Sequence, residues 1–367
     1  MPPVVPAVLD SSAAPRGGAA AKFTSTYGAL SREVRDAGLL RRAYGYYLVN
    51  GVALVLALGG VATGFVLLGD SWFQLLIAAA LGVVLTQLAF LTHETAHRQV
   101  FASGPLNDRV GRILANAVVG ISYSWWMTKH TRHHANPNQV GKDPDVAPGV
   151  ISFTEEAASD HHGFLGAITR RQGWLFFPLL TLEGINLHVT AVRSLLTGTP
   201  EDRASRQREL VTILVRLTLY VAVVLWWLPL GLGFAFLGVQ LAVFGVYMGA
   251  TFAPNHKGMT MIPEGSRIDF LSKQVLTSRN VRGGAWMSIL MGGLNLQVEH
   301  HLFPSMPRPH LARARLLVRA HCARLGLPYT ETSLLRSYAI VVRYLNEVGL
   351  AARDPFDCPM RQRLGRR

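Results

Sequence analysis

The apolar positions of the chain are gathered into long runs rather than spread with a strand or surface-helix period. One run covers 46–68, and a second covers 72–92 after the break Gly69-Asp70-Ser71. Each run has the roughly 20 residues that a helix needs to cross the hydrocarbon of a bilayer. The pattern therefore predicts two membrane-spanning helices joined by a short polar turn.

A second uncharged region, Leu217–Asn255, is too long for a single crossing. Pro229-Leu230-Gly231-Leu232-Gly233 places a turn near its middle, because proline and glycine interrupt helices. We expect two further spans, at 211–230 and 233–255, with the charged end of Arg216 reaching the interface. The fold class is then all-α, a polytopic membrane protein with four transmembrane helices in two hairpins.

Three other apolar stretches compete as spans: Ile113–Met127, 174–192 and Ala285–Leu296. The first and third are short, and the second contains Glu183 and His188. We expect interfacial or re-entrant helices at all three places, since one extra crossing would move everything after it to the other side of the membrane.

Composition and charge agree with a membrane protein. Hydrophobic residues make up 50% of the chain and charged residues 16%, against about 25% charged residues in soluble domains. Two cysteines are too few for a disulfide scaffold. The net charge of +14 would suit nucleic acid, but Lys and Arg are absent from Ala43–His97 and Leu217–His256 and gather on their flanks. This is the positive-inside pattern, so we expect no nucleic-acid partner.

The same pattern predicts location and domain boundaries. Both hairpin tips lack Lys and Arg, which places the rest of the chain and both termini in the cytoplasm. Arginine outnumbers lysine 31 to 5, a bias typical of GC-rich coding, so we expect a bacterial plasma membrane. The first 22 residues are rich in Ala and Pro and are expected to form a disordered arm. They have no long apolar core, which argues against a cleavable signal peptide. The predicted parts are a disordered arm and cytoplasmic segment at 1–45, a membrane domain at 46–353 with a cytoplasmic helical cap at 93–210 and 256–353, and a basic tail at 354–367.

Histidines carry the candidate chemistry. At positions i and i+4 of a helix, two imidazoles lie on one face and can reach one metal ion. A solitary histidine is usually a satisfied core residue, but seven of the 13 histidines fall into three clusters. The clusters are His93 and His97; His130, His133 and His134; and Gln297, His300 and His301.

Seven imidazoles on one side of the membrane are too many for one tetrahedral zinc ion. They suit two metal ions, and imidazole ligands with open positions suit iron as readily as zinc. The spacing alone does not separate iron from zinc.

These three clusters, read as HxxxH, HxxHH and QxxHH, resemble the signatures of the integral-membrane fatty acid desaturases in order and spacing. The strings around them, at 133–138, 141–145 and 292–296, are similar too. The resemblance covers roughly Tyr46–His321. Gln297 stands where many members have histidine, as in the acyl-lipid and front-end types.

The resemblance implies two iron ions held mainly by imidazoles, with O2 and two electrons used to remove two hydrogens from an acyl chain. Family ligation also uses a histidine between the last span and the third box, and His256 alone is available there. No catalytic residue apart from the metal site and no other cofactor are expected. The candidate ligands are His93, His97, His130, His133, His134, His256, His300 and His301.

Several polar residues beside the boxes could support the ligands. Carboxylates commonly orient metal-bound imidazoles through the outer ring nitrogen, and solvated carboxylates are the alternative. Asn295 could bind metal through a water or cap a turn. The candidates for indirect or water-mediated contacts are Gln297, Asn295, Glu94, Glu299, Asp143 and Asp145.

The resemblance also implies partners. The substrate would be a fatty acyl chain on CoA, a carrier protein or a membrane lipid, entering a tunnel between the spans and the cap. The chain has no His-Pro-Gly-Gly string typical of a fused cytochrome b5 domain, so a separate ferredoxin, cytochrome b5-like protein or reductase would supply electrons. Alternatives are hydroxylation on the same scaffold and a His-rich metal transporter, which the near absence of ionisable residues inside the spans disfavours.

Overall fold

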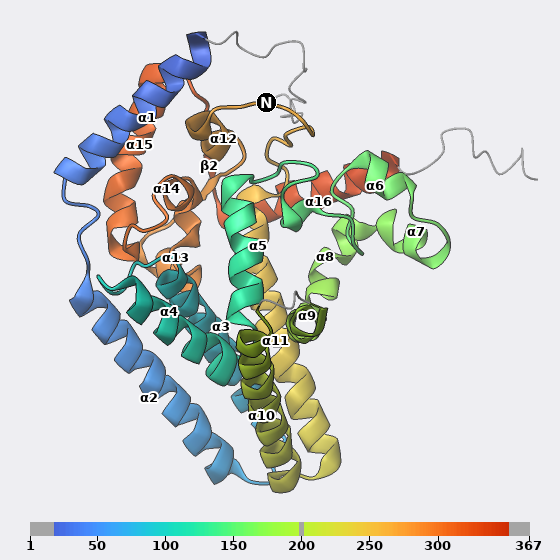
Figure 1. The fold of residues 1–367 in the computed structure, drawn as a ribbon. Helices are drawn as coiled ribbons and strands as arrows, with labels where there is room; N and C mark the ends of the chain where they lie inside the picture. The colour runs from blue at the N-terminus through green and yellow to red at the C-terminus, as the bar shows by residue number, and fades with distance from the viewer. Residues whose placement is uncertain (1–17, 198–201, 352–367) are drawn as a thin grey trace, which may run out of the picture.

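The computed structural model describes residues 18–197 and 202–351 (Figure 1). The first 17 residues of the predicted disordered arm and the predicted basic tail lie outside this part of the chain. Helices dominate the described residues, and the one small sheet pairs two short parallel strands.

The elements up to the second long pair of helices are α1 (Gly18–Asp36), α2 (Tyr44–Leu68), α3 (Gln74–Ala96), α4 (Gly104–Arg112), a π-helix (Ile113–Val119), α5 (Tyr123–Ala135), α6 (Glu155–Ser159), α7 (Gly163–Thr169), α8 (Gln172–Leu180) and α9 (Glu183–Thr197). They are followed by α10 (Arg203–Trp227), α11 (Leu230–His256), α12 (Phe270–Leu276), β1 (Asn280–Val281), α13 (Ala285–Leu290), α14 (Gln297–Leu302), α15 (Leu311–Leu325), β2 (Glu331–Thr332) and α16 (Leu334–Ala351).

The four predicted spans correspond to α2, α3, α10 and α11, the four single helices of the described chain that are long and apolar enough to cross a membrane. α2 and α3 are joined at residues 69–73, and α10 and α11 at Leu228 and Pro229. Figure 1 shows the four helices extending from one end of the molecule. The prediction of an all-helical membrane fold is confirmed.

The start of α10 differs from the predicted span. The helix begins at Arg203, eight residues before the predicted position 211. Hydropathy marks where a chain enters hydrocarbon, whereas a helix continues through polar residues as long as its backbone hydrogen bonds form. The polar turn containing Arg206 and Glu209 is therefore helical.

α3 and α11 are the inner pair of the four helices. In the most apolar window of α3, 39% of residues are buried, against 6% in α2. Gly82 lets the two inner helices approach closely, because a Cβ there would lie 2.9 Å from the carbonyl oxygen of Gln240. The core between the helices includes Leu85, Phe236 and Phe244. The inner helices therefore end next to each other at the histidine-rich side.

The segments between α3 and α10 and after α11 form the cap, a layer of short helices over that end. α8 and α9 meet at a bend of 74°, which is the geometry of a broken span or a re-entrant loop. Ile113–Val119 forms a π-helix, and Ala285–Leu290 forms the short helix α13. The predicted interfacial or re-entrant position of these three segments stays a prediction.

α1 closes the cap on one side. It begins at Gly18, so the last five of the 22 residues expected to be disordered belong to a helix. Its apolar residues Leu30 and Val34 share a buried core with Val318 of α15 and Leu271 of α12. Figure 1 shows α1 lying beside α15. The alanines at the start of α1 favour a helix. The apolar residues of α1 also pack against α12 and α15, which stabilises this helix.

Candidate metal centre

The three histidine boxes meet at the cap end of the inner helices. His93 lies in the last turn of α3, and His256 is the final residue of α11. The second box lies in α5 and the third in α14, both in the cap. Segments more than 200 residues apart in sequence thus share one buried cluster because the two inner spans end at the same level.

Five imidazoles form the first group. His130 Nε2 lies 3.1 Å from His93 Nε2 and 2.7 Å from His97 Nε2. A single N–H on His130 could satisfy only one of these neighbours, so the convergence is better explained by lone pairs that share an ion. All five residues offer ring nitrogens within 4.8 Å of one another: His93, His97, His130, His134 and His300.

Three imidazoles form the second group: His133, His256 and His301. The Nε2 atoms of His133 and His256 lie 3.4 Å apart. The carboxamide of Gln297 lies 2.9 Å from His256 Nε2, within reach of an ion held by that nitrogen. The structure therefore divides the eight predicted ligands into groups of five and three, and Gln297 stands beside the smaller group.

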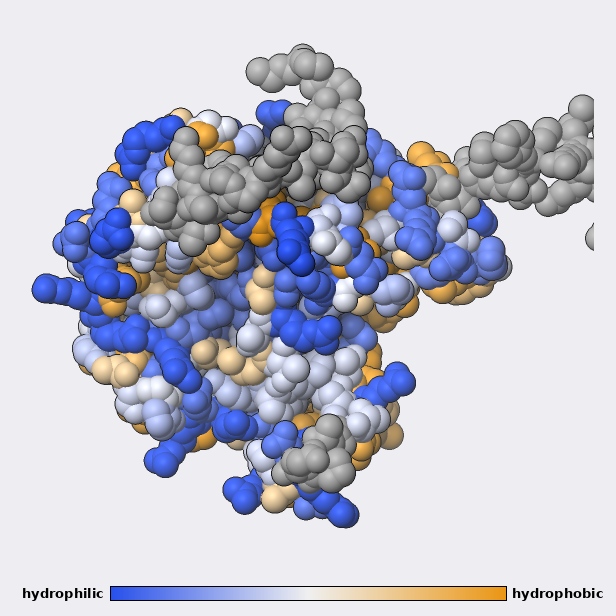
Figure 2. Space-filling view, turned by 45° about the horizontal axis from the view of Figure 1, so that its top comes forward, coloured by the Kyte–Doolittle hydropathy of each residue, from blue (hydrophilic) through white to orange (hydrophobic). Residues whose placement is uncertain are grey.

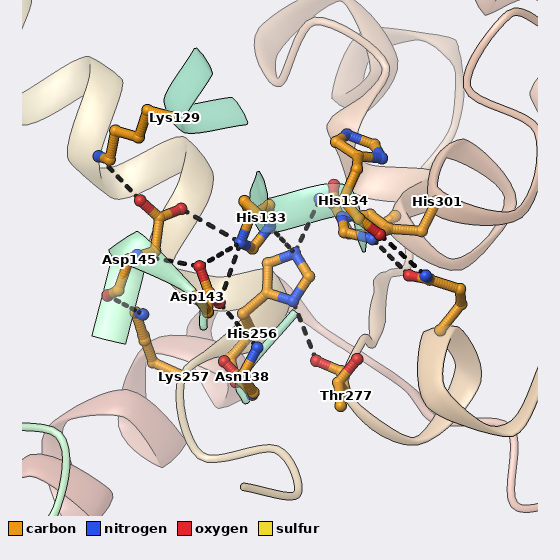
Figure 3. Close-up of polar contacts among 12 residues, drawn as sticks. Lys129, His133, His134, Asn138, Asp143, Asp145, His256, Lys257, Thr277 and His301 are labelled. Atoms are coloured by element: carbon orange, nitrogen blue, oxygen red, sulfur yellow. Dashed lines mark hydrogen bonds and ion pairs between the residues drawn. The ribbon is translucent and has the colours of Figure 1, made fainter. Parts of the chain in front are cut away.

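The outer ring nitrogens of the second group have partners (Figure 3). His133 Nδ1 lies 3.0 Å from Asp143 Oδ1, and His256 Nδ1 lies 3.0 Å from the carbonyl oxygen of Thr277. His301 Nδ1 lies 2.8 Å from Gln274 Oε1. Because carboxylate and carbonyl oxygens accept, each Nδ1 must donate, which leaves each Nε2 with a lone pair for a metal ion.

A second observation also indicates that these residues fit a pair of metal ions. In the described chain, both ring nitrogens of His134 and the Nε2 atoms of His300 and His301 are buried and have no hydrogen-bond partner. Buried polar atoms without partners are costly in a folded protein. Ligation of an ion would satisfy them, and nitrogen ligands of this kind suit iron, copper, nickel or zinc.

Asp143 and Asp145 both lie beside His133, as Figure 3 shows. Asp145 Oδ2 lies 3.4 Å from His133 Nδ1, and its Oδ1 accepts from Lys129 Nζ at 2.8 Å. Burial by itself would raise the pKa of Asp145, but Lys129, His133 and Lys257 together outweigh it and lower that pKa. Asp143 also accepts from the backbone N–H groups of Asn138 and Asp145, which hold the carboxylate toward the imidazole.

Two of the predicted supporting residues have other partners. Glu94 pairs with Arg308, and Glu299 accepts hydrogen bonds from Asn280 and from Tyr329. Neither carboxylate bonds an imidazole in the described chain, because the i+1 side chain on a helix points away from the face of its neighbour. Glu94 and Glu299 therefore make no direct hydrogen bond to an imidazole among the described residues, and an indirect or water-mediated contact stays a prediction.

Asn295 is 1% exposed, and its Oδ1 has no partner among the described residues. Asn295 lies in the 3-10 turn Leu294–Leu296, whose N-cap is Gly293. The capping role considered from sequence has no hydrogen bond to support it among the described residues. A water-mediated contact with metal stays a prediction for this residue.

Sequence reasoning missed several residues that support the boxes. Gln274 of α12 bonds His301 and also donates to the carbonyl oxygen of His134 at 2.9 Å, which joins two boxes. Trp126 stacks on His130 with ring centroids 4.3 Å apart. Arg308 reaches Glu94 inside the first box. A lone Gln or Arg in a cap segment has no spacing signal, whereas Trp126 could have been found from its i+4 relation to His130.

Burial of the imidazoles predicts a pH dependence for the metal-free protein. Burial lowers the pKa of His97 to about 3 and lowers the pKa of His130, His134, His300 and His301. Below the free-histidine pKa of about 6.5 the unfolded chain binds more protons than the folded chain, so folding stability is lost as pH falls. For each imidazole that stays neutral in the folded chain, the free energy of unfolding falls by about 1.4 kcal/mol for every pH unit below about 6.5.

Thermal unfolding of the metal-free protein in detergent, followed from pH 8 to pH 5, measures this effect. The melting temperature should fall steeply below about pH 6.5. His162→Gln is the control, because His162 is exposed and lies outside the cluster. A melting temperature that stays level to about pH 5 would show that the buried imidazoles do not resist protonation.

Four apolar helices, two of which end at an eight-histidine cluster, define a polytopic membrane protein with a histidine-rich site compatible with metal ions. A family profile described as fatty acid desaturase matches residues 70–333, which include all three boxes. The chain belongs to the fatty acid desaturase family.

Individual relatives agree with this family. The chain is 30% identical to an acyl-lipid (9-3)-desaturase of Physcomitrium patens over 76% of its length, and spans 54% of that protein. It is 26% identical to a Delta(8)-fatty-acid desaturase of Helianthus annuus, covering 89% of this chain and 74% of the relative. It is also 26% identical to a Delta 8-(E)-sphingolipid desaturase of Kluyveromyces lactis, with 92% and 61% covered.

Proposed function

We propose that the protein is an O2-dependent, di-iron acyl desaturase that introduces a double bond into a fatty acyl chain. The observation that carries the proposal is the position of the histidine cluster against an apolar cavity. The relatives named above act on fatty acids, acyl lipids and sphingolipids according to their names, which supports an acyl substrate for this chain.

The cavity begins at the metal cluster. His93 of the five-imidazole group is one of its lining residues, and Phe90 and Phe252 line it from the two inner spans. Trp126 of α5 and Met248 of α11 also contribute. With a volume of about 40 Å³, the cavity leaves room for a short part of a slender apolar group. An acyl chain is the substrate that such walls select, because apolar walls offer no hydrogen bonds to a polar one.

Iron is the metal that best fits the proposed reaction. The five imidazoles of the larger group exceed the four ligands of tetrahedral zinc. When bound, two iron ions would supply the redox chemistry that cleaves an unactivated C–H bond. Overall, two adjacent CH2 groups, O2, two electrons and two protons would yield one C=C bond and two waters.

The residues of the protein would position the acyl chain and keep water away from the reacting carbons. The apolar lining excludes water from the carbons next to His93. An unactivated C–H bond gives no acid–base handle, so the cavity must select the position along the chain by geometry. Asp143, Thr277 and Gln274 hold three imidazoles in one orientation through their outer nitrogens.

The electrons would come from a separate ferredoxin, cytochrome b5-like protein or reductase. Figure 2 shows hydrophilic side chains over much of the cap end of the molecule, which would stand in water. The chain has 36 Lys and Arg residues against 22 Asp and Glu residues. Its net positive charge would attract an acidic electron donor. We propose a bacterial plasma membrane with the cap and both termini in the cytoplasm.

Expression in a bacterial host with a simple fatty acid profile, followed by mass spectrometry of total lipids, tests the function. Wild-type protein should produce acyl chains that have lost two hydrogens, and His300→Ala should produce none, because it removes a member of the five-imidazole group. Chains that gain an oxygen atom instead would identify a hydroxylase. Tight zinc with no lipid product in any host tested would favour metal transport.

A further inference from the structure

One wall of the apolar cavity is an unusual helix. Ile113–Val119 is π-helical and ends at Gly120, which has the left-handed φ of 92° that glycine adopts without strain. The N–H of Gly120 donates to the carbonyl oxygen of Ala115 at 2.7 Å, five residues back. π-helices are rare and less well bonded than α-helices, and they often occur at functional sites.

Three residues of this segment face the cavity. Ala115, Val119 and Ile121 all line it and are all less than 10% exposed. The opposite walls come from the inner spans, which are well packed against each other. The π-helical segment (residues 113–121) and the start of α5 are therefore the parts of the cavity wall that do not belong to the spans themselves.

A charged residue from a span holds this segment. Arg216 Nε donates to the carbonyl oxygen of Val118 at 2.9 Å. The Arg216 side chain also packs under Gly120, where a Cβ would lie 3.3 Å from its Cδ. His188 Nε2 is 3.4 Å from the carbonyl oxygen of Val119, but His188 Nδ1 is 2.6 Å from Gly184 O, and a neutral imidazole donates only once. Arg216 is thus the main side-chain donor to the segment.

Arg216 makes further contacts within the spans. It lies in α10, near the start of the predicted third span, where a charged side chain either reaches the interface or takes a partner. Its guanidinium lies 5.0 Å from the ring centre of Tyr220, whose hydroxyl donates to Gln240 Oε1 of α11 at 3.1 Å. This chain of contacts ties the π-helical segment to α11.

We infer that Arg216 is a positioning residue that holds the π-helical segment against the cavity and thereby determines which acyl chain lengths the enzyme accepts. The inference rests on the proposed function and assigns its selectivity. One methylene in an apolar pocket is worth roughly 10- to 200-fold in selectivity, so a wall that moves by less than a carbon–carbon bond is sufficient.

Two substitutions separate the hydrogen bond from the charge. Arg216→Met keeps the length and removes the donor, whereas Arg216→Gln places an N–H at the bond position of Arg Nε without the charge. The readout is the ratio of conversion of two acyl chains that differ in length, measured with the full-length holoenzyme in membranes. Arg208→Met is the matched control, because Arg208 is exposed on the same helix.

We expect Arg216→Met to lower the chain-length ratio roughly tenfold while iron per chain is retained, and Arg216→Gln and Arg208→Met to keep the wild-type ratio. Ala115→Leu, which fills the cavity from the same wall, should shift the preference to shorter chains. Backbone amides of residues 113–121 should exchange with deuterium faster in Arg216→Met than in Arg216→Gln.

An unchanged ratio in Arg216→Met, an equal loss in Arg216→Gln, or loss of iron together with activity would overturn the inference while leaving the proposed function intact. A wild-type protein that converts neither chain would instead overturn the proposed function, and the selectivity assigned to Arg216 with it. In that case the amide exchange would still show whether Arg216 holds the segment.

Discussion

Replacing His133 with alanine is expected to abolish desaturation and to remove the ion held by the three-imidazole group. The group contains only His133, His256 and His301, so the change leaves two imidazoles. It also leaves the carboxylate of Asp143 without the imidazole that it holds. Loss of an outer partner of a ligand already costs about 10- to 100-fold in metal affinity or activity, and loss of the ligand itself should cost more.

Iron per purified chain and lipid products measured on the same preparation test this result. Asp143→Asn serves as the graded comparison, because it weakens the orienting contact and keeps the imidazole; we expect a loss of about 10- to 100-fold. His162→Gln, an exposed histidine outside the cluster, should behave as wild type. Full iron content and normal products in His133→Ala would remove His133 from the proposed ligand set.

Replacing Arg308 with methionine is expected to destabilise the protein by about 3 to 5 kcal/mol, the usual cost of leaving one member of a buried ion pair alone. The Arg308 and Glu94 side chains are 4% and 2% exposed. Glu94 lies between the two histidines of the first box, and the backbone N–H of Arg308 meets the hydroxyl of Tyr47 at 3.3 Å. The pair therefore joins α2, α3 and the segment after the third box.

A double-substitution cycle with Glu94→Met distinguishes the pair from general packing. If the ion pair carries the effect, Glu94→Met combined with Arg308→Met should be more stable than Arg308→Met alone, because no unpaired charge remains. Thermal unfolding of the four proteins in one detergent gives the comparison. Equal destabilisation by Arg308→Met in both backgrounds would show that the charge of Glu94 is not involved.

Much of the architecture was predictable from local sequence. The runs at 46–68 and 72–92 correspond to α2 and α3 within a few residues, because the length and polarity of a span are properties of a continuous segment. The two histidines of the first box could be placed on one helical face from their spacing alone. The start of α10 at Arg203 was not predictable in this way, since polar residues continue the helix beyond the apolar run.

Contacts between side chains that are distant in sequence could not be predicted from residue spacing. Gln274 joins His301 to the backbone of His134, and Arg308 pairs with Glu94, which is 214 residues earlier. Each of these is a single polar residue without a repeated spacing. Their side chains become partners only after the cap has folded over the inner spans.

The sequence by itself determined that the chain has four apolar helices long enough to cross a membrane and which histidines stand out, because both features are encoded in consecutive residues. Only the tertiary structure decided that eight imidazoles divide into groups of five and three, that Glu94 faces Arg308, and that Arg216 bonds the wall of the cavity. The reason is physical: which atoms meet in a buried site depends on how helix ends and cap segments pack, and the alternatives differ by contacts between residues far apart in the chain.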